Sequence, residues 1–161
     1  MKKDTINLTK KIIDKLTKDH HTITFAESCT GGRVASTFTA ISGASSVLNG
    51  SLVTYSNDIK HQWLKVPYEV LENKGAVSSE CVSYMLEGAK EMAKSDYAIA
   101  ISGIAGPSGG TEFKPVGTVY IGILTPHTKE IFHSLFDGDR EAVQQQSVDF
   151  AIEKLAFLIN L

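Results

Sequence analysis

The spacing of apolar and polar residues changes repeatedly along this chain, and each change predicts a helix or a strand. Near the N-terminus, apolar residues recur at helical spacing opposite a lysine-rich face, which predicts an amphipathic helix over residues 5–18. Uncharged stretches predict strands at residues 22–26, 97–102 and 116–124. A partial alternation of apolar with small or polar residues predicts another strand at residues 47–56.

Helix-start signals lie between these strands. Asn57, Ser78 and Asp139 are expected to cap helices that end near residue 64, near residue 94 and near the C-terminus, because Asn, Ser and Asp accept the unpaired N–H groups of a first turn. Pro67 is expected at the first position of a short helix that ends near residue 73. A further helix is expected over residues 32–41.

Strands and helices alternate through the whole chain, which predicts an α/β fold. We expect a three-layer α/β/α sandwich with a mixed, mostly parallel sheet, in a single domain over residues 1–161. The predicted strand at residues 130–136 follows the one at 116–124 closely enough to form an antiparallel hairpin.

Composition narrows the class of protein. A net charge of −2 without a basic run argues against nucleic acid as a partner. The sequence contains no stretch of about 18 apolar residues, so we expect no membrane span. Met1, Lys2 and Lys3 are not followed by the apolar run of a secretory signal. Two cysteines, Cys29 and Cys81, indicate reduced thiols and a cytoplasmic location. No Cys/His group has zinc spacing, so we expect neither a metal nor a cofactor.

The strongest candidate chemistry lies at Ser28, in a small, glycine-containing turn between a predicted strand and a predicted helix. A serine in front of a helix is most often an N-cap. A hydroxyl at this junction can also be a nucleophile, provided that a base removes its proton. Cys29 is a rival nucleophile, since a helix N-terminus can lower a thiol pKa, but it has no obvious base.

Lys60 is a candidate for that base. It lies one turn into a predicted helix, and Tyr55 ends the strand before it. Burial can lower the pKa of a lysine toward neutrality, although most lysines are solvated. Ser28 and Lys60 stand 32 positions apart in different elements, so spacing alone does not bring them together.

A glycine-rich segment follows the buried strand that ends near Ser102. It should lie at the carboxyl end of that strand, where α/β proteins bind ligands, and its N–H groups suit a phosphate or an oxyanion. It matches neither a P-loop nor a dinucleotide fingerprint, and the alternative is a plain loop. Arg140, at a helix start, could bind an anion through two nitrogens or stay exposed behind an Asp139 cap.

Together, six stretches resemble the CinA C-terminal domain family, also called nicotinamide-nucleotide amidohydrolases or NMN deamidases (PncC type). The resemblance covers about residues 5–158. The stretches are residues 26–32, 55–60, 75–78, 103–111, 114–119 and 138–140.

The resemblance implies hydrolysis of the amide of nicotinamide mononucleotide to nicotinate mononucleotide and ammonia. It implies Ser28 as nucleophile, Lys60 as base, Tyr55 as a group that orients or shares protons, and Glu27 as a residue that positions the site. Substrate contacts are expected from Thr30, Gly31, Ser102, Gly103, Gly106, Gly109, Gly110 and Arg140.

This chain departs mildly from the family pattern. Ser102 stands where threonine is usual and keeps the hydroxyl, and Ser108 stands where glycine or aspartate is usual. Some family members carry a larger N-terminal domain with nucleotide-pyrophosphatase chemistry, which we do not expect in a chain of this length.

Two other functions stay open at this stage. One is a non-catalytic nucleotide-binding module linked to competence or the DNA-damage response. The other is a phosphoryl-transfer enzyme, which ranks last because only Glu112 lies near the glycine segment as a metal ligand. We also expect a homo-oligomer, since a neighbouring subunit could complete the site of so small a domain.

Overall fold

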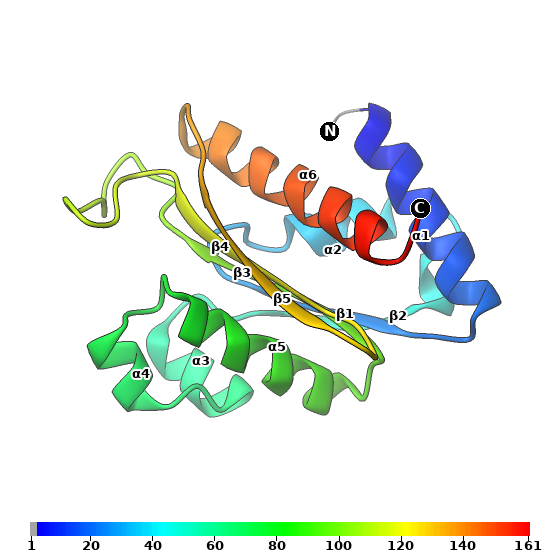
Figure 1. Ribbon diagram of the computed structural model, residues 1–161, viewed down its shortest axis with the longest axis horizontal. Coiled ribbons are helices and arrows are strands. Elements are labelled where there is room, and N and C mark those ends of the chain that lie inside the picture. The colour runs from blue at the N-terminus through cyan, green and yellow to red at the C-terminus, as the bar shows by residue number, and fades with distance from the viewer. Residues whose placement is uncertain (1–2) are drawn as a thin grey trace.

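A five-stranded mixed sheet runs through the computed structural model, which describes residues 3–161 (Figure 1). In spatial order the strands are β2 (Leu48–Val53), β1 (Ile23–Glu27), β3 (Tyr97–Gly103), β4 (Thr118–Leu124) and β5 (Lys129–Leu135). β1 is parallel to both β2 and β3, whereas β4 is antiparallel to both β3 and β5. The predicted mixed sheet and its β4–β5 hairpin are therefore confirmed.

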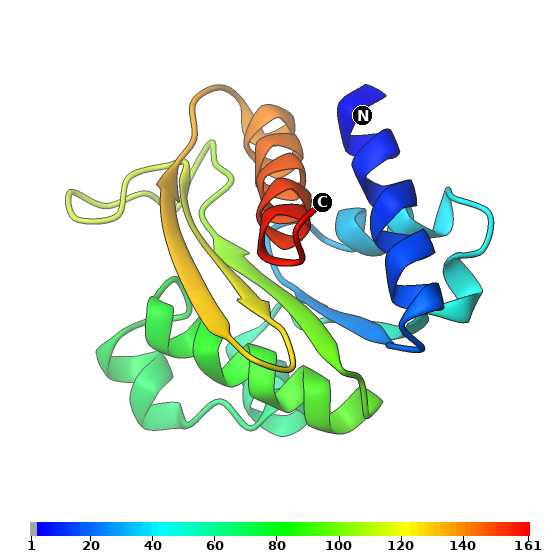
Figure 2. The same cartoon turned by 45° about the vertical axis from the view of Figure 1, so that its right-hand side comes forward.

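Helices cover both faces of this sheet (Figures 1 and 2). One face carries α1 (Lys3–Lys18), α2 (Arg33–Thr39) and α6 (Arg140–Leu158), and the other carries α3 (Asn57–Leu64), α4 (Tyr68–Asn73) and α5 (Ser79–Ala93). A short 3-10 helix, Ala44–Ser46, precedes β2. Each layer has its own apolar core against the sheet, which confirms the three-layer α/β fold. Within residues 3–161, none of the helices combines the length and the apolar character that a membrane crossing requires.

The two central strands bring their last residues to one end of the sheet. β3 is buried up to its final residue, as its uncharged sequence predicts, and β1 is buried throughout, including the charged Glu27. The parallel register pairs Glu27 with Ile101, and the Ser28 N–H donates to the Ile101 carbonyl over 3.0 Å. Ser28 and Ser102 therefore lie beside each other at the carboxyl ends of β1 and β3.

Local capping signals locate most helix starts correctly. The Ser78 hydroxyl accepts the N–H of Cys81, and the Asp139 carboxylate accepts that of Ala142, so both predicted caps are confirmed. The prediction that Asn57 caps α3 is wrong. Ser56, in an extended conformation, accepts the N–H of Ile59, and Asn57 is already helical.

Two further boundaries differ from the prediction. β2 ends at Val53, so Tyr55 lies in the loop before α3 and not at the end of a strand. Pro67 is the N-cap residue of α4, one position earlier than expected, because its extended backbone precedes the first helical residue.

Gly88 lets α3 lie close to α5. A Cβ at this position would come within 2.7 Å of the Leu64 Cα, at the C-terminal end of α3. No side chain larger than hydrogen fits there without moving one helix. The close contact therefore contributes to the position of α3, which carries Lys60.

Candidate active site

A cavity of about 270 Å³ opens at the carboxyl ends of β1 and β3. Segments distant in sequence line it: the turn after β1, the start of α3, the loop before α5, the loop after β3 and the first residue of α6. Such a position is the usual ligand site of open α/β sheets.

Eight of the predicted site residues line this cavity: Ser28, Tyr55, Lys60, Ser102, Gly103, Gly106, Gly109 and Arg140. The other predicted site residues, Glu27, Thr30, Gly31 and Gly110, are not among its lining residues. The lining also includes Asn57, Ala76 and Val77, which sequence reasoning missed because a cap position and two small apolar residues carry no chemical signal.

The fold brings Ser28 and Lys60 into contact. The Lys60 Nζ lies 3.0 Å from the Ser28 Oγ, and it lies 2.7 Å from the Thr54 carbonyl and 3.5 Å from the Tyr55 carbonyl. A neutral amine has two N–H bonds and one lone pair. If the two carbonyls take the N–H bonds, the lone pair faces the serine hydroxyl, which is the arrangement that proton removal requires.

The surroundings of Lys60 favour that neutral amine. The side chain is only 1% exposed, and no carboxylate within residues 3–161 forms an ion pair with it. Burial lowers the pKa of the Lys60 amine, and the neighbouring thiols of Cys81 and Cys29 oppose this only in part. A buried lysine without a counter-ion is suited to act as a base.

Ser28 does not cap α2. The N-cap residue is Gly32, which has a left-handed backbone (φ 100°) and no side chain that could accept an N–H. The buried carboxylate of Glu27 provides it instead and accepts the N–H groups of Gly32, Val34 and Ala35 over 3.0–3.1 Å. The capping alternative for Ser28 is therefore wrong, because the preceding residue satisfies the helix end.

Glu27 also holds Thr30, whose hydroxyl donates to the same carboxylate over 2.7 Å. Both side chains are almost fully buried. A negative charge at a helix N-terminus is favourable, and each of these bonds fixes one part of the turn. Glu27 thus shapes the turn that presents Ser28 without itself lining the cavity.

Cys29 is a weaker nucleophile than its position in the sequence indicates. Burial raises the pKa of the Cys29 thiol to about 12, which outweighs the opposing effects of its own backbone N–H and of Lys60. Burial likewise raises the pKa of Cys81 to about 11. A thiolate is therefore scarce at neutral pH, and the lowered pKa expected at a helix start is not found.

Arg140 joins two walls of the cavity. Its guanidinium donates to the Gly106 carbonyl over 2.6 Å and to the Tyr55 hydroxyl over 2.8 Å. Within residues 3–161 it contacts no carboxylate. The left-handed backbone of Gly106 (φ +81°) suits only glycine, and this conformation aims its carbonyl at Arg140.

Ser102 holds the part of the cavity wall that contains Ala76. Its hydroxyl donates to the Ala76 carbonyl over 2.8 Å, and the residue is 1% exposed. The hydroxyl that serine shares with the family's usual threonine therefore ties the end of β3 to the loop before α5.

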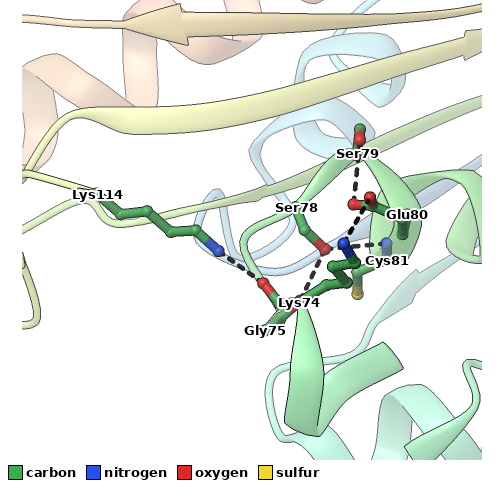
Figure 3. Close-up of polar contacts among 7 residues, drawn as sticks. All are labelled: Lys74, Gly75, Ser78, Ser79, Glu80, Cys81 and Lys114. Carbon is green, nitrogen blue, oxygen red and sulfur yellow. Dashed lines mark hydrogen bonds and ion pairs between the residues drawn. The ribbon is translucent and has the colours of Figure 1, made fainter. Parts of the chain in front are cut away.

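The same loop receives two more side chains (Figure 3). Lys114 extends from the β3–β4 loop, and its Nζ donates to the Lys74 carbonyl over 2.7 Å, while the Ser78 hydroxyl donates to the Gly75 carbonyl over 2.8 Å. Together with the bond to Ala76, three successive carbonyls of this wall are held by side chains. The wall is thus positioned by contacts from three different elements.

No group of three or more His, Cys, Asp and Glu side chains within residues 3–161 has an arrangement that could hold a metal ion. The polar side chains that line the cavity include the Ser28 hydroxyl, the Lys60 amine and the Arg140 guanidinium, and the described lining residues include no carboxylate. This fold and site define a class: an α/β protein with a buried lysine–serine contact at the carboxyl ends of its parallel strands.

Comparison with known proteins identifies the family. The model of the CinA C-terminal domain matches residues 5–159, and the chain belongs to this family. It is 46% identical over 144 residues to a CinA-like protein of Fervidobacterium nodosum, covering 89% of this chain and 35% of that protein. A CinA-like protein of Petrotoga mobilis is 45% identical over 149 residues, covering 92% and 37%. The chain thus spans just over a third of the length of these curated relatives.

Solved structures agree over nearly the whole fold. The competence damage-inducible protein A of Klebsiella pneumoniae superposes with a TM-score of 0.93 at 35% identity, covering 97% of each chain. The competence/damage inducible protein of Agrobacterium tumefaciens superposes with a TM-score of 0.92 at 35% identity, covering 98% of this chain and 97% of the other.

Proposed function

We propose that this chain hydrolyses the carboxamide of nicotinamide mononucleotide, giving nicotinate mononucleotide and ammonia. The observation that carries the proposal is the 3.0 Å contact between the Lys60 Nζ and the Ser28 Oγ, in a cavity that also receives Arg140. The resemblance of the site motifs to the NMN deamidases supplies the substrate class.

The first half of the reaction forms an acyl-enzyme. Neutral Lys60 takes the Ser28 proton as Oγ attacks the carboxamide carbon, and the carbonyl electron pair moves onto oxygen. When this tetrahedral intermediate collapses, the C–N bond breaks and the Lys60 ammonium gives its proton to the departing nitrogen. Ammonia leaves, and the pyridine acyl group remains as an ester on Ser28.

The second half repeats these steps with water. Lys60 removes a proton from a water molecule as it attacks the ester carbon. The C–O bond to Ser28 then breaks, and the serine oxygen recovers a proton from Lys60. The carboxylic acid formed loses its remaining proton to solvent and leaves as the nicotinate carboxylate, and the pair returns to its starting state.

The phosphate end of the substrate is proposed to meet Arg140 and the glycine-containing loop after β3. A guanidinium can turn its donors to phosphate oxygens, and free N–H groups of small residues suit an anion. A cavity of about 270 Å³ is at the small end of ligand pockets, so it suits a mononucleotide better than a dinucleotide.

Ammonia release from nicotinamide mononucleotide tests the proposal. We expect turnover by the wild type and a loss of about 10³-fold or more in Ser28→Ala and Lys60→Met. Ser108→Ala is the matched serine control, since Ser108 lines the same cavity without contacting Lys60, and Lys65→Met is the matched lysine control. Unchanged activity in both Ser28→Ala and Lys60→Met would refute the assigned roles.

A second candidate is a nucleotide-binding module that acts in competence or the DNA-damage response without catalysis. The solved relatives from Klebsiella pneumoniae and Agrobacterium tumefaciens are named for competence and damage induction, which supports the biological setting of this alternative. Calorimetric binding of nicotinamide mononucleotide with no ammonia after long incubation would support this function over hydrolysis.

A further inference from the structure

Helix α6 reaches the nucleophile turn through a residue outside the predicted site. The Gln144 Nε2 donates to the Cys29 carbonyl over 2.7 Å, one helical turn after Arg140. Gln144 does not line the cavity, and within residues 3–161 the Cys29 carbonyl accepts no other hydrogen bond. This contact therefore restrains the rotation of the peptide between Cys29 and Thr30.

The same turn contains two N–H groups with no oxygen acceptor. The N–H groups of Ser28, Gly31, Gly32 and Arg33 all donate to oxygens. Those of Cys29 and Thr30 donate to no oxygen of residues 3–161, and Cys29 has only its own sulfur as an acceptor.

Donors without an oxygen acceptor at these positions need an explanation. Cys29 is 5% and Thr30 is 1% exposed, and buried backbone N–H groups are nearly always paired. The two groups follow Ser28 directly, at the start of the turn that leads into α2. Cys29 lines the cavity, and Thr30 is the next residue behind that lining. A pair of N–H groups without oxygen acceptors beside a nucleophile is the arrangement that stabilises an oxyanion in acyl transfer.

Peptide geometry connects Gln144 to these donors. In a planar trans peptide the carbonyl and the following N–H point in opposite directions. Holding the Cys29 carbonyl toward α6 therefore aims the Thr30 N–H to the opposite side of the turn. Rotation of this peptide by even a modest angle would turn the donor away from its acceptor.

We infer that Gln144 is a positioning residue: through the Cys29 carbonyl it orients the Thr30 N–H, which forms an oxyanion hole together with the Cys29 N–H for acyl transfer at Ser28. The inference rests on the proposed amide hydrolysis. When the Ser28 Oγ bonds to the carboxamide carbon, the carbonyl electron pair moves to oxygen, and these N–H groups bind the resulting negative charge. The pair returns to the carbonyl as the C–N bond breaks.

Steady-state hydrolysis of nicotinamide mononucleotide provides the first test. Gln144→Met keeps the length of the side chain and removes the donor, so we expect kcat to fall about tenfold to a hundredfold with KM within about twofold. Gln144→Lys restores a donor and should recover most of kcat. Gln146→Met is the matched control, since Gln146 donates to the Asp137 and Ala142 carbonyls of the same helix region, and it should keep wild-type kcat.

Labelling of Ser28 by a fluorophosphonate separates this inference from the choice of substrate. Ser28 Oγ displaces fluoride, Lys60 takes the proton, and charge develops on the phosphoryl oxygen, which would use the same N–H groups. Mass spectrometry should show Ser28 labelled about tenfold more slowly or worse in Gln144→Met than in the wild type or Gln146→Met.

The outcomes are distinguishable. Slow labelling of Gln144→Met supports the inference even if nicotinamide mononucleotide is not a substrate, in which case only the proposed function fails. The inference is overturned by equal labelling of wild type and Gln144→Met, by an effect on KM alone, or by an equal loss in Gln146→Met. A wild type that is neither labelled at Ser28 nor active overturns both proposals.

Discussion

The two sides of the cavity are held in different ways. On the side of the nucleophile, the Glu27 carboxylate binds one hydroxyl and three N–H groups within eight residues of itself in the sequence. On the opposite side, the β3–β4 loop is attached by long side chains: Arg140 reaches the Gly106 carbonyl, and Lys114 reaches the Lys74 carbonyl. This loop extends from the body of the fold and carries Phe113, which is 91% exposed (Figures 1 and 2).

This difference separates chemistry from recognition. Reacting groups must be held within a fraction of an ångström, which buried, charge-assisted bonds of short sequence range achieve. A binding wall can be attached by exposed bonds that cost little to break. Changes on the Glu27 side should therefore lower stability and kcat, and changes on the loop side should mainly raise KM.

The largest effect is expected at Glu27. Glu27→Gln keeps the size of the side chain but turns an NH₂ group toward backbone N–H donors. Leaving buried donors unpaired should reduce the free energy of unfolding by about 1–3 kcal/mol. Misplacing Ser28 should reduce kcat about a hundredfold. Urea unfolding and ammonia release measure both, and Glu72→Gln, on the exposed surface of α4, is the matched control. Wild-type stability in Glu27→Gln would contradict the structural role.

The pH dependence should show a smaller effect. Only the neutral Lys60 amine can take the Ser28 proton, so kcat/KM should rise with pH, falling about tenfold for each unit below the Lys60 pKa. Because burial lowers this pKa, the midpoint should lie below the ordinary lysine value of about 10.4. The profile of kcat/KM from pH 6 to pH 10, in roughly half-unit steps, measures it. A midpoint at or above the ordinary value would count against Lys60 as the base.

The smallest effect is expected at Lys114. Lys114→Met removes the bond to the Lys74 carbonyl, and losing one exposed hydrogen bond of about 1 kcal/mol should raise KM about fivefold while kcat stays unchanged. Lys65→Met is the matched control, because Lys65 also donates to a backbone carbonyl, that of Gln62, but attaches no part of the β3–β4 loop. A fall in kcat with constant KM would show that the two sides of the cavity are not separable in this way.

Most helices and strands of the fold could be predicted from local sequence. A few neighbouring residues were enough to predict the uncharged strand β3, the alternating strand β2 and the helix starts at Ser78 and Asp139. Boundaries were less secure where two neighbours can both cap, as at Ser56 and Asn57. Their choice depends on which residue takes the extended conformation.

For the candidate site, too, the sequence identified some features and left others to the tertiary structure. Residue types alone single out Ser28, the glycine-containing loop and Arg140, because each stands next to a predicted strand end or helix start. The sequence by itself therefore determined the elements, the family and the candidate groups.

Only the tertiary structure decided which groups meet. It set the Lys60–Ser28 contact across 32 positions and the Gln144–Cys29 contact across 115. It also made Glu27, and not Ser28, the residue whose side chain accepts the N–H groups at the N-terminal end of α2. Burial, which lowers the pKa of Lys60 and raises that of Cys29, also emerges only there. The physical reason is that strand register and helix packing set these distances and this exclusion of water, and neither is encoded in the spacing of nearby residues.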